Sequence, residues 1–306
     1  MKREKLPPRI SSEKGSTLRP VNPGAEKWLN RPVKCLDHGF VYLVDYLGTD
    51  SEIARSARVS YGKGTKQVSE DQGLLRYLMR NAHTSPLEMA ELKFHCKMPI
   101  FVARQWIRHR TANVNEYSGR YSEMLDEFYT PPPAVLRKQS QTNRQGRGDE
   151  RLTPAQEARV LELLKGLYKE QYGAYKEMLG MGLTRELSRI GLSVANYTQW
   201  YWKIDLHNLF HFLRLRLDSH AQYEIRVFGE AMAQIVKDAF PIAYAAFEDY
   251  QVNAQRFSGP ELELLSAAIK GTLQKPLQEA ALERFQNKRE TEEFLAKARL
   301  LGLLSD

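Results

Sequence analysis

The chain has 306 residues, which is enough for one large core or two modest domains, and its formal net charge is +8. Two cysteines are too few for a disulfide framework and suit a reducing cytosol. No apolar run approaches the roughly 18 residues of a membrane span, and the N-terminus lacks the apolar region of a signal peptide. We therefore expect a soluble, cytoplasmic protein.

Residues 1–32 are polar and basic, with eight Lys or Arg, three Glu and five of the 14 prolines. This composition predicts a mostly irregular arm. The apolar-rich runs 33–36 and 40–47, on either side of Asp37-His38-Gly39, predict a β-hairpin. Residues 50–61 are expected to form a short helix.

The stretch Gly62-Lys63-Gly64-Thr65 is not a phosphate-binding P-loop. That motif requires Ser or Thr directly after its Gly-Lys and a glycine five positions before it, and these places hold Gly64 and Ala57. Residues 68–82 show a helical leucine stripe. Ser85-Pro86 then has the composition of a helix start.

Residues 91–98 alternate between apolar and polar side chains, which predicts a half-buried strand with His95 and Lys97 on its polar face. Cys96 falls on the apolar face, so we expect an inert core thiol. Neither cysteine lies in a motif that indicates a nucleophile.

Four arginines and one carboxylate occur between Ile100 and Tyr121. We expect a helix over 100–110, with Arg104 and Arg108 one turn apart, followed by an extended backbone that aims Glu116, Ser118 and Arg120 the same way. Arginine forks bind phosphates in a bidentate manner, and Ser and Gly complete such sites. The stretch predicts an anion-binding loop, although a basic surface helix followed by a loop explains the charge equally well.

Residues 138–150 are polar and of low complexity, and we expect an exposed insertion there. Gly146-Arg-Gly148 lacks both a preceding strand and a third glycine, so it is not a dinucleotide fingerprint. A long helix should run from Thr153-Pro154 to about Met181, with an apolar stripe in the core, and another should begin at Thr184.

The four aromatic residues between 197 and 202 are expected in the core or in a subunit interface. His207 and His211 have the spacing of zinc ligands, but no third ligand motif accompanies them and we predict no metal. Residues 227–240 should form a helix that ends or kinks at Pro241, with a further helical stretch over 242–250. Beyond the break at Ser258-Gly259-Pro260 we expect a small helical appendage.

Two motifs resemble those of the flavin-dependent thymidylate synthases. The first is Arg108-His109-Arg110 followed after seven residues by Ser118, flanked by Gln105 and by Glu116 to Arg120. The second is Arg216 followed by the run Ala221-Gln-Tyr-Glu-Ile-Arg226. The resemblance covers residues 33–253, which leaves 1–32 as a basic arm and 254–306 as the appendage.

The resemblance implies an α+β fold with a curved, mixed or antiparallel sheet and long helices, assembled as a homotetramer with active sites between subunits. It implies reductive methylation of dUMP to dTMP, with methylenetetrahydrofolate as methyl donor, NADPH-reduced FAD as hydride source and no cysteine nucleophile. It also implies small-molecule partners and neither nucleic acid nor membrane.

The resemblance assigns site residues by position. Arg216 would be catalytic, because a guanidinium keeps its charge beside a uracil ionised at N3. His83 would lie on the folate side. The dUMP contacts would be Gln105, Arg108, Glu116, Tyr117, Ser118, Gly119, Arg120, Arg189 and Arg216. The FAD contacts would be Ser85, Arg108, His109, Arg110, Glu116, Asp205, His207 and His211.

Three of these flavin contacts depart from the family pattern, because Asp205, His207 and His211 stand where some members carry Asn or Arg. Two alternatives also remain at this point. A nucleic-acid-binding protein would use the basic arm and the arginine-rich loop and would show steep salt dependence. A flavin-dependent reductase of another substrate would share the cofactor but not the nucleotide site.

Overall fold

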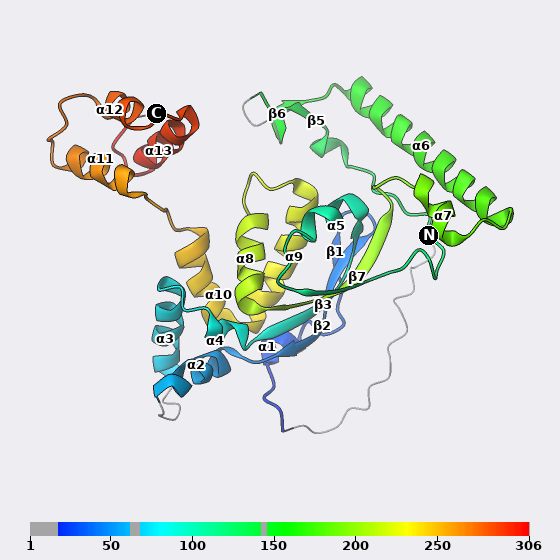
Figure 1. The fold of residues 1–306 in the computed structure, drawn as a ribbon, viewed down its shortest axis with the longest axis horizontal. Coiled ribbons are helices and arrows are strands. Elements are labelled where there is room, and N and C mark those ends of the chain that lie inside the picture. Colours follow the sequence, from blue (N-terminus) through cyan, green and yellow to red (C-terminus); the bar gives the residue numbers. More distant parts are fainter. Residues whose placement is uncertain (1–17, 62–67, 142–145, 306) are drawn as a thin grey trace. The chain divides into compact units, whose positions relative to one another are not determined.

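The computed structural model describes residues 18–61, 68–141 and 146–305, and it divides the chain into two compact units, Met1–Glu248 and Asp249–Asp306 (Figure 1). The sequence placed this boundary between residues 253 and 254. The rejected P-loop at 62–65 and most of the arm lie outside the described residues. Among the described helices, none combines the length and the apolar character that a bilayer-crossing segment requires.

The first unit is built on a five-stranded sheet in the order β1-β2-β3-β7-β4, and each of these neighbouring strands pairs antiparallel. The strands are β1 (Val33–Cys35), β2 (Gly39–Leu47), β3 (Glu91–Pro99), β4 (Asn113–Glu116) and β7 (Tyr197–Asp205). The predicted hairpin is confirmed as β1 and β2. The α+β class with an antiparallel sheet is confirmed too, while the curvature of the sheet stays a prediction.

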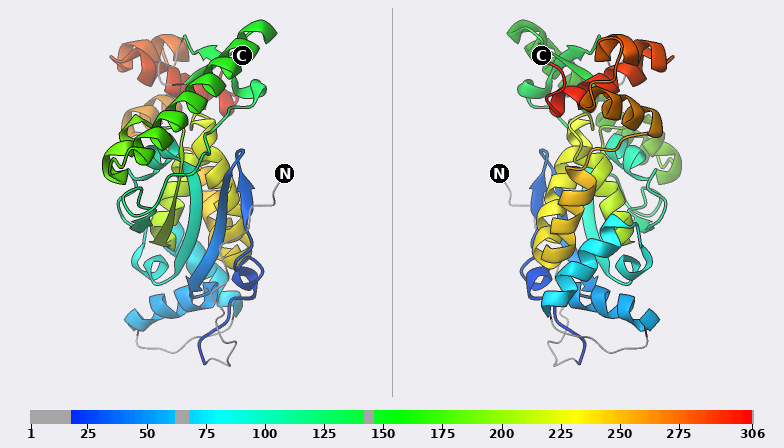
Figure 2. Two further views of the ribbon diagram at one scale, coloured as in Figure 1. Left: turned by 90° about the vertical axis from the view of Figure 1, so that its right-hand side faces the viewer. Right: turned by 90° about the vertical axis from the view of Figure 1, so that its left-hand side faces the viewer.

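One face of the sheet is covered by helices (Figure 2). Phe94 of β3 lies opposite Trp202 of β7, and both rings are fully buried. Trp106 packs on Trp202 with ring centroids 5.2 Å apart and on Phe212 at 5.0 Å. These contacts hold α5 (Ile100–Trp106) and α8 (Leu206–Arg216) against the sheet, and Phe228 of α9 (Tyr223–Ala239) packs on Trp106 with centroids 5.8 Å apart. The aromatic residues predicted for the core in β7 are confirmed there, except for Tyr201, which points to the other face with 42% exposure.

The polar face predicted for β3 is exposed only in its first half. His95 and Lys97 are 7% and 3% exposed, so the expectation of a half-buried strand is wrong at these two positions. Both side chains have specific partners: His95 bonds to Tyr42 and Gln199, and Lys97 pairs with Glu127 at 2.7 Å. Hydrogen bonds and an ion pair from other elements thus compensate the cost of burying these two polar side chains, which the alternating sequence pattern did not predict.

The arm is more ordered near its end than its composition predicted. Residues 23–26 form α1 (Pro23–Glu26), capped by Asn22, whose side-chain amide also donates to the carbonyl oxygen of Ala239 at 2.7 Å. A Cβ on Gly24 would lie 1.8 Å from the carbonyl oxygen of Asp238, so only glycine permits this approach to α9.

The helices between β2 and β3 follow the predictions closely. They are α2 (Asp50–Arg58) with the 3₁₀ turn Val59–Tyr61, α3 (Val68–Arg80) and α4 (Ser85–Glu88). Proline is in the first turn of α4 as expected, but Thr84 rather than Ser85 occupies the N-cap position. The α4 helix packs against α8.

The segment predicted as an irregular insertion is a two-stranded hairpin of β5 (Arg137–Gln139) and β6 (Arg147–Arg151), preceded by the 3₁₀ turn Pro133–Val135. The low-complexity composition concealed this pairing. The following helix, α6 (Pro154–Gly180), is confirmed, with Thr153 and Gln156 forming a capping box. Its predicted core stripe is only partly correct, because Tyr175 is the one buried residue of the helix.

The remaining elements of the first unit are α7 (Arg185–Ser188), the 3₁₀ turn Arg189–Gly191 and α10 (Pro241–Phe247), and a π-turn follows at Glu248–Val252. Pro241 ends α9 and starts α10, as predicted. The second unit consists of α11 (Gly259–Ile269), α12 (Leu277–Arg284) and α13 (Lys288–Leu300). Its own core includes Leu265, Ala281, Phe285 and Phe294.

Candidate active site

The last turn of α8 brings Arg216 against His109, two residues that are far apart in the sequence. The chain leaves its helical path after Trp106, which is fully buried, and this places His109 beside α8. The Nε and Nη2 groups of Arg216 lie 3.1 and 3.0 Å from Nε2 of His109. The predicted catalytic arginine and a predicted flavin-facing histidine are therefore in direct contact.

His109 is neutral in this environment. Its pKa is lowered from 6.5 to about 4 by burial, by the charge of Arg216 and by His211, whose ring centroid is 5.8 Å away. An unprotonated Nε2 accepts hydrogen bonds from a guanidinium, whereas an imidazolium would repel it. Burial also lowers the pKa of Arg216, from a value so high that the guanidinium keeps its charge near neutral pH.

Three further predicted flavin contacts lie on α8. Asp205 is the N-cap of this helix, and its carboxylate accepts a hydrogen bond from the backbone N–H of Asn208 at 2.9 Å. This carboxylate therefore already stabilises the start of the helix. His207 is half-buried one turn before His211, which is exposed. No group of three potential metal ligands occurs among the described residues.

The predicted nucleotide loop begins at the end of β4. The carboxylate of Glu116 accepts from the hydroxyl of Thr198 at 2.7 Å. Tyr117 donates through its backbone N–H to the carbonyl oxygen of Gln199 at 2.8 Å. The expected extended backbone up to Arg120 is wrong, because the chain turns after Ser118, whose carbonyl oxygen accepts from the N–H of Tyr121.

The turn packs Gly119 against Arg189. A Cβ at Gly119 would lie 2.8 Å from Sδ of Met124 and 3.0 Å from Cδ of Arg189, so a side chain does not fit without a shift. Arg120 forms an ion pair with Glu186 at 3.3 Å. The loop and the α7 region thus place two arginines beside a turn that contains Ser118, a combination that suits a phosphate.

Gln105 connects this region to a polar network that sequence reasoning did not assign. Its Nε2 lies 3.5 Å from Oε1 of Gln222, and Nε2 of Gln222 lies 2.9 Å from Oε2 of Glu224. Glu224 is 2% exposed and is paired with Arg147 of β6. The only sequence signal was that Gln222 and Glu224 fall within the second motif.

Arg108 and Arg110 extend from the chain beyond α5 and are exposed. Within the described residues neither guanidinium has a carboxylate partner. Unpaired guanidiniums beside the neutral His109 form a cationic surface that suits an anionic ligand.

His83 and Ser85 lie in a different hollow of about 980 Å³, lined by residues of α2, α3 and α4. The ring of His83 meets that of Tyr77 edge to face, with centroids 5.4 Å apart. None of the described residues that line this hollow belongs to the group around His109 and Arg216. A single chain therefore does not unite all the predicted contacts.

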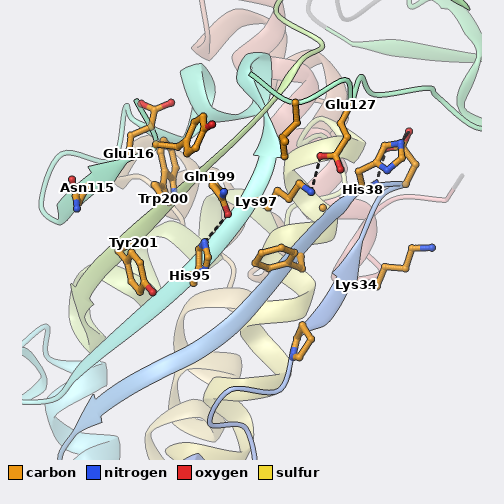
Figure 3. A pocket seen from close by; sticks show the side chains of 16 residues that line it. Lys34, His38, His95, Lys97, Asn115, Glu116, Glu127, Gln199, Trp200 and Tyr201 are labelled. Atoms are coloured by element: carbon orange, nitrogen blue, oxygen red, sulfur yellow. Dashed lines mark hydrogen bonds and ion pairs between the residues drawn. The ribbon is translucent and has the colours of Figure 1, made fainter. Parts of the chain in front are cut away.

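The open face of the sheet borders a cavity of about 950 Å³, shown in Figure 3. Glu116 and Tyr117 are among its lining residues, together with aromatic rings such as Phe40 and Tyr201 and with several charged side chains. His95 lies on its floor and is stacked on Tyr201 with centroids 4.8 Å apart. Burial lowers the pKa of His95, which is neutral between its two hydrogen-bond partners.

Neither cysteine is poised for nucleophilic attack. Both thiols are buried, and burial raises the pKa of Cys35 to about 12 and that of Cys96 well above its ordinary value. The thiolate, which is the reactive form, is therefore scarce near neutral pH. The expected inert thiol at Cys96 is confirmed.

Comparisons with known proteins agree with these motifs. The family model described as thymidylate synthase complementing protein matches residues 42–242. A protein of Ruegeria pomeroyi named flavin-dependent thymidylate synthase is 56% identical over 259 residues, covering 83% of this chain and 85% of the relative. A protein of the same name from Wolbachia pipientis wMel is 55% identical over 238 residues, covering 78% and 84%.

A solved structure gives the same result for the fold. The UMP/dUMP methylase PolB of Streptomyces cacaoi, bound with 5-Br dUMP, superimposes with a TM-score of 0.65 at 29% identity. The match covers 72% of this chain and 99% of that chain. The match therefore leaves part of this chain uncovered.

Proposed function

The chain belongs to the family of flavin-dependent thymidylate synthases, and we propose on that premise that it methylates dUMP to dTMP with a bound flavin. The reaction class follows from the comparisons, because the names of the relatives and of the solved structure agree on a pyrimidine nucleotide methylase. The roles of individual residues are inferred from their geometry in this chain.

We propose FAD as the flavin, methylenetetrahydrofolate as the methyl donor and NADPH as the source of hydride. When bound, the flavin supplies the hydride chemistry that no side chain can perform. The residues fit such a group: Arg108 and Arg110 offer unpaired guanidiniums to the FAD pyrophosphate, and His109 offers a neutral ring beside them. His207 and His211 extend the same surface along α8.

Arg216 activates the pyrimidine in this proposal. Two of its N–H groups are directed to His109, which fixes the plane of the guanidinium and leaves other N–H groups for a ligand. Its permanent positive charge favours the uracil ring that has lost the proton at N3. A neutral His109 serves this purpose better than a charged one, because it does not compete for the anion.

The phosphate of dUMP is assigned to the turn after β4. Ser118 and Arg120 present a hydroxyl and a guanidinium, and Arg189 packs closely against Gly119 between them. The ion pair of Arg120 with Glu186 is half-exposed, so exchange of the carboxylate for a phosphate costs little.

A cysteine nucleophile is not needed by this reaction and not favoured by this chain. Since both thiols are buried with raised pKa values, activation of the uracil rests on charge and orientation rather than on covalent attack. This is the observation that separates the proposal from the cysteine-dependent route to dTMP.

The proposed assembly is a homotetramer in the cytoplasm with active sites between subunits. The separate hollow around His83 and Ser85 supports it, because these two predicted contacts would reach flavin and folate only from a neighbouring subunit. Size-exclusion chromatography with light scattering tests the assembly directly.

The contact of Arg216 with a neutral His109 is the observation that carries the catalytic assignment. The test is to incubate the purified protein with FAD, NADPH, methylenetetrahydrofolate and dUMP and to follow dTMP by chromatography. We expect dTMP and tetrahydrofolate in equal amounts. Formation of NADP without dTMP would instead indicate a flavin-dependent reductase of another substrate.

A further inference from the structure

A buried carboxylate lies behind the predicted nucleotide site. Glu224, in the first turn of α9, is 2% exposed and accepts four hydrogen bonds from three residues. Arg147 of β6 forms an ion pair with both of its oxygens, the hydroxyl of Tyr129 donates to Oε1 at 3.0 Å, and Nε2 of Gln222 donates to Oε2 at 2.9 Å. Such complete satisfaction compensates the cost of burying a charge.

The chemistry of this carboxylate fixes the direction of the neighbouring amide. An ionised carboxylate only accepts hydrogen bonds, so Gln222 must turn its NH₂ group toward Glu224. The carbonyl oxygen of Gln222 then points away from Glu224, and it lies 3.5 Å from Nε2 of Gln105. That oxygen can only accept, so Gln105 in turn directs its NH₂ group toward Gln222.

The direction that Glu224 imposes on Gln222 therefore extends to Gln105, which is left with its carbonyl oxygen and the second hydrogen of its NH₂ group for a ligand. Within the described residues no other side chain or backbone group bonds to that oxygen. Gln105 lies in α5, four residues before His109 and three before Arg108. This relay of hydrogen bonds, from Glu224 through Gln222 to Gln105, thus reaches the segment that contains the first motif.

We propose that Glu224 and Gln222 are positioning residues that hold the side chain of Gln105 with its carbonyl oxygen toward the nucleotide. This inference rests on the proposed function. An amide oxygen accepts from a hydroxyl or a ring N–H and is repelled by phosphate oxygens, which also only accept. With its oxygen held toward the nucleotide, Gln105 is assigned to the sugar or the base, and the phosphate is assigned to the turn at Ser118–Arg120.

The hairpin of β5 and β6 gains a role from the same geometry. Arg147 is the cation that pairs with the Glu224 carboxylate, and it reaches that carboxylate from a segment 77 residues earlier in the chain. A neutral, protonated Glu224 could donate as well as accept, and the direction of Gln222 would no longer be determined. The hairpin thus supports the site without touching the nucleotide.

The test compares Gln222→Met, Gln105→Met and the double variant in complex with FAD. Dissociation constants for dUMP and for deoxyuridine, which has no phosphate, are read from the change in flavin absorbance. Each single variant should weaken dUMP binding about fivefold, the value of one hydrogen bond. The double variant should be no weaker than Gln105→Met, and the same loss should appear with deoxyuridine.

Two results would overturn the relay. Additive losses in the double variant would mean that the two glutamines act independently. A loss that appears with dUMP but vanishes with deoxyuridine would place Gln105 on the phosphate. In either case wild-type protein that binds FAD and dUMP would leave the proposed function intact, whereas wild-type protein that binds neither would overturn both.

Arg147→Met and Arg151→Met form a matched pair for the support from the hairpin. Both arginines are on β6 and both are ion-paired, Arg147 with Glu224 and Arg151 with Glu157. Arg147→Met should raise the KM for dUMP about fivefold with kcat little changed, and Arg151→Met should leave both at wild-type values. Equal effects of the two variants would mean that the hairpin contributes only to stability and does not position Gln105 through Glu224.

Discussion

The two parts of the predicted site differ in how far one chain completes them. Around Arg216 and Gln105 the side chains are held in place by partners within the chain: His109 fixes the guanidinium, and Gln222 and Glu224 fix the amide. Arg108 and Arg110, by contrast, are exposed and without carboxylate partners within the described residues. The first part is preorganised for chemistry. The second is a cationic surface whose guanidiniums would be paired only when an anionic ligand binds.

Arg216→Ala should break the preorganised part with the largest effect. The variant should retain flavin but lose dTMP formation by a factor of about 100 or more, because a charge-stabilising donor in a water-excluded site is worth that much. Arg214→Ala, two residues earlier on α8, is the control and should stay within a few-fold of wild type. Near-normal turnover of Arg216→Ala would remove this residue from its role.

Arg108→Ala should act on the exposed part, with a loss of affinity rather than of chemistry. We expect flavin or nucleotide binding to weaken about tenfold at low salt, and the loss to shrink at high salt, since exposed charges are screened. Arg104→Ala, also exposed and one helical turn earlier, supplies the comparison by fluorescence titration. Unchanged affinities in Arg108→Ala would refute the assignment.

Gly119→Ala should disturb the turn that is assigned to the phosphate of dUMP. Its Cβ would lie 2.8 Å from Met124 and 3.0 Å from Arg189, an overpacking worth about 1–3 kcal/mol. We expect a several-fold weaker affinity for dUMP by calorimetry. Gly191→Ala is the matched control, because nothing lies within 4 Å of its Cβ position, and equal affinities of the two variants would contradict the tight fit.

The smallest expected effect is a pH dependence of stability that comes from His109. Its pKa is about 4 in the folded protein and near 6.5 when unfolded, so below pH 6.5 the unfolded chain binds a proton that the folded chain does not. The free energy of unfolding should fall as the pH drops from 7 toward 4.

His109→Gln, which cannot titrate, should lose less stability over this range than wild type in urea unfolding at pH 7 and pH 5. Other groups contribute equally to both proteins, so the difference isolates the imidazole. An identical fall in both would show that His109 is not buried as a neutral ring.

The sequence predicted those features that depend on local pattern. The hairpin at Asp37, the strand at 91–98 and the capped helix at Thr153 follow from alternation, turn residues and caps, which are properties of neighbouring residues. The burial of His95 and Lys97 was missed because it depends on Tyr42, Gln199 and Glu127, which are brought in by the fold.

In the site, too, the sequence predicted local motifs but not the contacts that the fold creates. The two motifs named Gln105, His109 and Arg216 by position, and the structure adds that His109 and Arg216 touch. The support from Glu224 and Arg147 was not predictable, because the hairpin that carries Arg147 is hidden in a polar segment without periodicity.

The visible absorbance spectrum of the purified protein, recorded before and after addition of dUMP, tests the central claim most directly. A flavin spectrum that shifts on addition of dUMP is the predicted result, because the nucleotide should bind against the flavin beside Arg216. A colourless protein that takes up no added FAD, or a flavin spectrum that dUMP leaves unchanged, would contradict a shared site for cofactor and nucleotide.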